Sequence, residues 1–211
     1  SSGSSVFEFI NPNNNEITDI VELWKNSESV VSDFRKVHYS FIFQNTNLFS
    51  NLSAIDNISF SAILQGTRKK KAGDDAEKIF KRILPRVDMH KPIPEYSGGE
   101  KQRIAFCRAI LASFTVLFAD EPTGNLDSGN AERLMEFLVE STNSKTAVVV
   151  THDIDLAVNT ADHIVLIRKV EDRLGLIDQE SSFLKKGSTW TNVQDNLSDS
   201  ELRSKLMQAL K

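Results

Sequence analysis

Two stretches of this 211-residue sequence place chemically useful groups at the ends of predicted secondary-structure elements. A Ser-Gly-Gly turn at 97–99 opens a predicted helix of about four turns. Its backbone N–H groups can approach a phosphate because the glycines carry no side chains. A predicted buried strand, 115–119, is followed by Asp120 and Glu121. Adjacent carboxylates repel each other, so this pair favours a bound cation or a catalytic role.

The elements that position these groups alternate between strand and helix, which predicts a parallel sheet. Parallel strands bring their carboxyl ends to one edge of the sheet, where ligands bind in open α/β folds. We therefore expect Asp120, Glu121 and His152, which follow predicted strands, to share that edge. The predicted strands are residues 39–43, 115–119, 146–151 and 163–168. One predicted helix follows the turn at 97–99 for about four turns, and two more cover 129–140 and 154–160.

The spacing of apolar residues and the capping residues predict the secondary structure of the remaining segments. Apolar residues at helical spacing predict helices over 52–64 and 74–84, and Ser27 is a candidate N-cap for a further helix. Residues 16–23 are predicted as a short strand region, and the basic run 68–71 as a solvated loop. After Lys169 the sequence becomes polar, and a last helix is predicted over 198–210.

Composition restricts the class of protein. The chain is 40% hydrophobic and 26% charged with a net charge of −4, and no basic stripe indicates broad nucleic-acid binding. The single cysteine, Cys107, excludes an internal disulfide and is interpreted as a packing residue. No apolar run approaches the roughly 20 residues of a membrane helix, and no signal peptide is evident. A role at a membrane would require docking to another chain.

Several motifs resemble those of ATP-binding-cassette (ABC) ATPases over roughly residues 9–168. Residues 97–102 (SGGEKQ) resemble the signature motif, 117–122 (LFADEP) the Walker B strand and 124–127 (GNLD) the D-loop. Gln44 follows a predicted strand 53 residues before Ser97, as in the Q-loop, and His152 lies 31 residues after Glu121. The wording ADEPTGNLD is similar to the subfamily that powers lipoprotein release and macrolide export.

The resemblance implies an α/β fold of the ABC ATPase type: a P-loop NTPase-like parallel sheet core flanked by helices, with an inserted helical subdomain. It implies four segments. Residues 1–44 are an incomplete N-terminal part of the ATP-binding core, and 45–112 form the helical subdomain with the Q-loop and signature motif. Residues 113–175 are the catalytic core with Walker B, D-loop and H-loop, and 176–211 are a C-terminal tail.

The resemblance also implies ATP and Mg²⁺ as cofactors. Asp120 and Gln44 are expected to hold Mg²⁺, and Glu121 to act as general base on the attacking water. Gln44 and His152 complete the expected catalytic set, with His152 bonded to the γ-phosphate. The residues expected to contact nucleotide are Ser97, Gly98, Gly99, Glu100, Asp127 and Ser5.

One part of the family pattern is missing. No Gly-x-x-x-x-Gly-Lys-Ser/Thr phosphate loop is present, and residues 3–7 (GSSVF) stand where a relative would have GKSTL. Ser4 then replaces the lysine, and serine cannot supply its positive charge to the phosphates. The gap reflects either a stretch absent from the sequence or a naturally degenerate subunit. We expect this polypeptide alone to bind ATP weakly and to hydrolyse it poorly.

The implied partners are a second ABC ATPase subunit and transmembrane permease subunits that dock at the Q-loop and helical subdomain, without nucleic acid. The implied location is cytoplasmic, peripheral on the inner face of the cell membrane. Two alternatives stay open: a soluble ABC ATPase, and a non-hydrolysing ABC-like interaction module. A chromosome-structure member would need a long coiled coil between Gln44 and Ser97, for which 53 residues leave no room.

Overall fold

A computed structural model describes residues 8–11, 14–143, 145–170, 173–176, 181–192 and 196–209, with backbone alone for 168–170 and 173–176. The chain divides into two compact units, Ser1–Val150 and Thr151–Lys211, and each is described by itself. None of the helices within the described ranges combines the length and apolarity needed to cross a bilayer.

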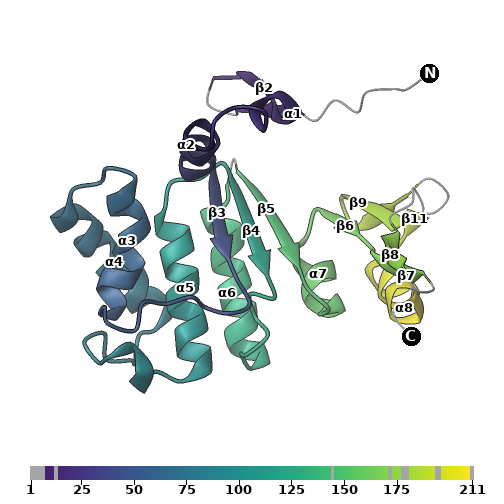
Figure 1. The fold of residues 1–211 in the computed structure, drawn as a ribbon. Helices are drawn as coiled ribbons and strands as arrows, with labels where there is room; N and C mark the ends of the chain where they lie inside the picture. Colours follow the sequence, from purple (N-terminus) through teal and green to yellow (C-terminus); the bar gives the residue numbers. More distant parts are fainter. Residues whose placement is uncertain are drawn as a thin grey trace. The chain divides into compact units, whose positions relative to one another are not determined.

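The first unit contains a parallel sheet with strand order β3-β4-β5 (Figure 1). The strands are β3 (Tyr39–Ile42), β4 (Val116–Asp120) and β5 (Thr146–Val150), each within one residue of its predicted ends. Helix α5 (Gly98–Leu111) leads into β4, and α6 (Ser128–Ser141) connects β4 with β5. The Ser40 hydroxyl of β3 donates to the Ala109 carbonyl of α5 at 2.9 Å. The predicted α/β fold with a parallel sheet is confirmed.

Three helices of the first unit share one apolar core. Helices α3 (Ala54–Leu64) and α4 (Lys69–Ile83) pack against each other and against α5, as Figure 1 shows, and the 3-10 turn Ile93–Glu95 closes the loop before α5. Ser53 caps α3 by accepting from the backbone N–H of Asp56 at 3.0 Å. The buried residues of this core are Ala54, Ile58, Ala76, Phe80, Leu84, Ile93, Tyr96, Ile104 and Cys107. The interpretation of Cys107 as a packing residue is confirmed, and burial raises the pKa of its thiol.

The prediction of a loop over the basic run 68–71 was wrong. Arg68 is the N-cap residue of α4, and Lys69 begins the helix. Lys71 pairs with Asp75 at 2.7 Å, and Lys78 pairs with the same carboxylate at 3.1 Å. These i,i+3 and i,i+4 pairs support a helix, for which lysine and arginine are good formers. The run is therefore the exposed first turn of α4.

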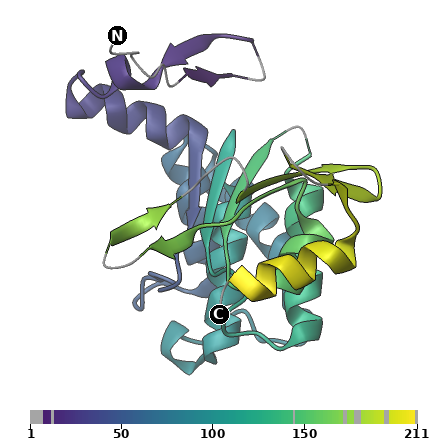
Figure 2. The ribbon, with the colours of Figure 1, turned by 90° about the vertical axis from the view of Figure 1, so that its right-hand side faces the viewer.

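The segment predicted as a strand over 16–23 is only partly one. Strand β2 (Ile17–Asp19) pairs antiparallel with β1 (Glu8–Ile10), but α1 (Ile20–Leu23) is helical. Asp19 ends the strand because its Oδ1 accepts from the backbone N–H of Val21 at 2.8 Å, an N-cap that the sequence reading overlooked. Helix α2 (Glu28–His38) follows, with Ser27 in the predicted N-cap position, and leads directly into β3 (Figure 2).

The second unit has its own core, which the prediction of a polar tail missed. Strand β6 (His163–Val165) does not extend the parallel sheet; it pairs antiparallel with β9 (Ser182–Lys186) in a sheet ordered β11-β10-β9-β6. Residues Phe183, Trp190, Leu202, Leu206 and Val158 are buried together. The other elements are α7 (Ile154–Thr160), β10 (Thr189–Thr191), β11 (Asn196–Leu197), α8 (Asp199–Ala209) and the hairpin β7 (Arg168–Val170) with β8 (Arg173–Leu176).

Candidate functional site

The carboxyl ends of the neighbouring strands β3 and β4 bring together three of the predicted site residues. Gln44 follows the end of β3 by two residues, Asp120 is the last residue of β4 and Glu121 follows it. The register pairs Ile42 with Ala119, so the two strands end side by side. Asp120 is exposed to solvent at this edge. Two acidic residues and one glutamine therefore lie at this edge.

The structure does not test the prediction that His152 shares this edge, nor the role expected of Ser5. His152 belongs to the second unit, two residues after the end of β5. Ser5 lies outside the described residues. Their expected roles stay predictions.

The backbone of Glu121 adopts a conformation that glutamate rarely takes. Its φ is +46°, in the left-handed region, which costs a non-glycine residue about 1 kcal/mol or more. Its N–H donates to the Val150 carbonyl at 2.9 Å, and its own carbonyl accepts from the Gln102 side chain at 3.0 Å. These bonds hold the turn between β4 and the following loop. Strain maintained in this way is typical of functional sites.

Gln102 ties the signature helix to the carboxylate edge, and sequence reasoning gave it no role. It lies on α5 and is 1% exposed. Its Nε2 donates to the Glu121 carbonyl, and its Oε1 accepts from Asn125 Nδ2 at 2.9 Å. Both ends of a buried amide are thus satisfied by residues of the Walker B and D-loop segments. A polar residue on the otherwise apolar inward face of the helix was the available signal.

The Ser-Gly-Gly turn forms a capped helix N-terminus. Ser97 is the N-cap of α5, and its hydroxyl accepts from the Glu100 N–H at 3.2 Å. Glu100 Oε2 accepts in return from the Ser97 N–H at 2.7 Å, which completes a capping box. No acceptor within the described part of the chain takes the N–H of Gly98 or Gly99. These two donors remain available for an anion.

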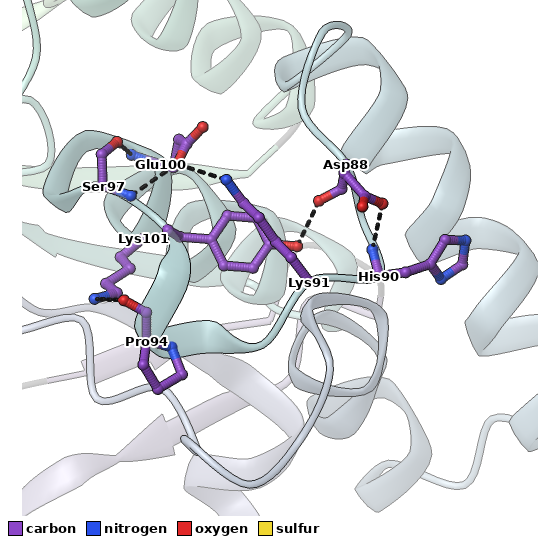
Figure 3. Close-up of polar contacts among 8 residues, drawn as sticks. Asp88, His90, Lys91, Pro94, Ser97, Glu100 and Lys101 are labelled. Atoms are coloured by element: carbon purple, nitrogen blue, oxygen red, sulfur yellow. Dashed lines mark hydrogen bonds and ion pairs between the residues drawn. The ribbon is translucent and has the colours of Figure 1, made fainter.

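The loop before α5 fixes Glu100 in this arrangement (Figure 3). Lys91 Nζ lies 3.3 Å from Glu100 Oε2 and 4.4 Å from the centroid of the Tyr96 ring. The Tyr96 hydroxyl donates to the Asp88 carbonyl at 2.8 Å, and burial together with nearby acids raises the Tyr96 pKa to about 12. Burial opposes ionisation of Glu100, but the Ser97 N–H and Lys91 outweigh it and lower the pKa of the Glu100 carboxyl.

The two glycines have different surroundings. A Cβ on Gly98 would meet no atom within 4 Å, whereas one on Gly99 would meet the Asn125 carbonyl at 3.0 Å and Leu126 Cδ2 at 3.1 Å. Gly99 therefore permits close packing between the start of α5 and the D-loop. Gly98 leaves open space at the helix N-terminus, where a ligand can approach.

Asp127 is the N-cap of α6, and its side chain is engaged within this chain. Its carboxylate accepts from the backbone N–H of Asn130 at 3.0 Å and from Asn130 Nδ2 at 2.6 Å. These two donors lower the pKa of the Asp127 carboxyl. Asp127 is thus held at the surface in its charged form.

The chemistry of the strand edge suits Mg²⁺. This ion keeps several waters and takes one or two protein carboxylates together with phosphate oxygens. No group of three or more His, Cys, Asp or Glu forms among the residues that the structure describes, so a closed all-protein cage is not offered there. The exposed carboxylate of Asp120 and the side-chain oxygen of Gln44 fit the smaller ligand set.

Comparison with known proteins identifies the family of this chain. Residues 4–124 match the family model described as ABC transporter. The chain is 37% identical over 163 residues to the macrolide export ATP-binding/permease protein MacB of Shewanella sp. (strain W3-18-1), covering 76% of this chain and 24% of that protein. It is 35% identical over 147 residues to the probable syringafactin export ATP-binding/permease protein SyfD of Pseudomonas syringae pv. syringae (strain B728a), covering 69% and 22%.

A solved structure of an ATP-binding cassette has a similar fold. The ATP-binding cassette MJ0796, in a dimeric post-hydrolysis state with ADP and Pi, superimposes with a TM-score of 0.63 at 28% identity, over 72% of this chain and 66% of that chain. The chain spans about a quarter of the length of the curated relatives it matches. The predicted family and ABC cassette fold are confirmed: this chain belongs to the ABC transporter family, as an ATP-binding cassette.

Proposed function

We propose that this chain is the ATP-binding subunit of a membrane transporter, and that it works by closing with a second cassette around ATP. The observation that carries the proposal is the shared strand edge of Gln44, Asp120 and Glu121 in a chain whose α5 begins with free glycine N–H donors. Phosphoryl transfer needs a metal, an oriented water and charge stabilisation. The edge and the helix N-terminus offer groups for each of these tasks.

Each residue has a role in this scheme. Asp120 and Gln44 hold Mg²⁺, and the carboxylate of Glu121 draws a proton from the attacking water. His152 bonds the γ-phosphate, and Ser5 would contact nucleotide at the residues that replace the phosphate loop. Mg²⁺, when bound, neutralises charge that develops on the phosphate oxygens.

The signature residues act on the other subunit's nucleotide. Gly98 and Gly99 donate N–H groups to a γ-phosphate held by the partner cassette, with Ser97 and Glu100 fixing the turn. Asp127 contacts the opposite subunit and couples the two sites. The dimeric state of the MJ0796 cassette supports this arrangement.

The loop after β3 is the proposed contact with a permease. Arg108 holds it in place by donating to the Asn47 carbonyl at 2.8 Å and to the Thr46 carbonyl at 2.9 Å. The fully buried Asn57 bonds both the N–H and the carbonyl of Phe49, whose side chain remains 42% exposed. A fixed loop with an exposed aromatic tip suits docking to another protein. The matched relatives are named as ATP-binding/permease proteins, which supports a permease partner and a place on the inner face of the cell membrane.

The missing phosphate-loop lysine favours a second candidate, a cassette that does not hydrolyse ATP at its own site but lends its signature to a competent partner. The printed sequence has serine at position 4, which cannot supply a fixed charge.

Turnover measurements separate these functions. The purified 211-residue chain with Mg²⁺ and ATP is expected to turn over far below the roughly 1–10² s⁻¹ of ordinary enzymes. Adding a cassette with an intact phosphate loop is expected to produce turnover that exceeds the sum of the two separate rates. Turnover at the ordinary rate by the chain alone would contradict the need for a partner's loop, and no gain on mixing with cassettes that co-purify would contradict the composite site.

A further inference from the structure

A basic cavity of about 580 Å³ lies in the first unit, away from the strand edge. It is bordered by the end of α4, the loop that follows it, and helices α5 and α6, which Figure 1 shows beside one another. Four arginines line it against two glutamates, an excess of two positive charges. The whole chain has a net charge of −4, so this excess is a local feature. The charged lining residues are Arg82, Arg86, Arg103, Arg133, Glu136 and Glu140.

The four arginines differ in what they bind. Arg82 is paired with Glu140 and lies over the Phe137 ring, with its guanidinium carbon 4.4 Å from the centroid. Arg86 and Arg133 are exposed and form no ion pair or hydrogen bond with any residue that the structure describes. The charge of Arg82 is therefore compensated, whereas those of Arg86 and Arg133 are available.

Arg103 supplies an independent sign of a missing ligand. One terminal nitrogen of its guanidinium donates to Asn130 Oδ1 at 2.8 Å. Its Nε is buried and has no hydrogen-bond partner among the described residues. An unsatisfied buried donor is costly, and more so on a charged group. Arg103 lines the cavity, so an acceptor bound there would satisfy this donor once the guanidinium turns toward it.

We propose that this cavity binds a small phosphate-bearing anion through Arg86, Arg103 and Arg133. Guanidinium groups bind phosphate oxygens with paired N–H donors, and the tetrahedral oxygens of phosphate can meet several arginines at once. The volume falls within the range of small-molecule sites. The site is distinct from the nucleotide edge, because none of its lining residues is Gln44, Asp120 or Glu121.

The cavity is joined to the D-loop by one chain of hydrogen bonds. Asn130 accepts from Arg103 and donates through Nδ2 to Asp127 at 2.6 Å. A ligand that fixes the Arg103 guanidinium therefore also fixes the N-cap of α6. Binding in the cavity is expected to slow hydrogen exchange of the Asn130 backbone N–H, which Asp127 accepts.

Inorganic pyrophosphate is the probe for the test, by isothermal titration calorimetry on the full chain at low salt. Arg86→Ala and Arg133→Ala are each expected to weaken binding by about tenfold or more, since each removes a charge-assisted hydrogen bond to the anion. Both residues are exposed, so the fold is expected to survive. Arg68→Ala, an exposed arginine outside the cavity, is the matched control and is expected to bind as the parent does.

A second control excludes the other anion site. Gly98→Asp places a carboxylate at the N-terminus of α5 and is expected to leave the arginine-dependent binding unchanged. Absence of pyrophosphate binding would overturn the proposal, as would binding that survives both arginine substitutions or that is lost in Gly98→Asp. Unchanged exchange of the Asn130 N–H on saturation would overturn the link to the D-loop.

Discussion

Gly98→Asp is expected to lower ATP turnover by about 10²–10³-fold when this chain is paired with a cassette that carries an intact phosphate loop. A side chain at position 98 meets no atom within 4 Å, and a carboxylate at the first position of α5 is favourable to the helix dipole. The fold is therefore retained. The new charge occupies the place where the partner's γ-phosphate would meet the Gly98 and Gly99 N–H groups.

Gly98→Asn is the matched control, because it has the same shape without the charge and is expected to lose much less turnover. Glu121→Gln in this chain is expected to change the rate of the mixed dimer by less than about twofold, since in the proposed scheme Glu121 serves the nucleotide site in which Ser4 replaces the lysine. Steady-state phosphate release at saturating ATP measures all three. Equal losses in the Asp and Asn variants would mean that size and not charge is responsible, which contradicts a phosphate at this helix N-terminus.

Trp190→Ala is expected to destabilise the second unit by about 3–5 kcal/mol. Trp190 is fully buried among Phe183, Leu202 and Leu206, and its Nε1 donates to Asp199 at 2.8 Å. Removal of the ring leaves both a cavity and an unpaired acceptor. Urea unfolding followed by far-ultraviolet circular dichroism measures the change, with the two units analysed as separate transitions.

Trp24→Ala is the control for that experiment. Trp24 is 53% exposed in the first unit, and Arg35 lies 4.5 Å from its ring centroid. Its loss is expected to cost at most about 1 kcal/mol. If Trp190→Ala costs no more than Trp24→Ala, the residues after β6 do not form the packed unit described here.

Short apolar runs in the sequence were sufficient to predict the strands that position the site. The apolar strands β3, β4 and β5 carry their signals within a few residues, and the structure places each within one residue of its predicted ends. Their parallel order then follows from strand–helix alternation, so the shared edge of Gln44 and Asp120 was predictable.

The features that were missed depend on partners far away in sequence. The left-handed φ of Glu121 is held by Gln102 and Val150, and neither contact has a local pattern. The core of the second unit is built from Phe183, Trp190 and Leu202, which are separated by polar residues and by turns and show no single period. A mostly polar segment can thus form a packed core when the fold brings its few apolar residues into contact.

The proposed metal–nucleotide site is tested most directly by finding which residues a divalent ion contacts in the presence of ATP. Mn²⁺, a paramagnetic substitute for Mg²⁺, is expected to broaden the amide signals of Gln44, Asp120 and Glu121 most strongly in a Mn²⁺–ATP titration, and Asp120→Asn is expected to remove most of that broadening. Broadening centred on any other region, or equal broadening in Asp120→Asn, would contradict a metal–nucleotide site at the carboxyl edge of the parallel sheet.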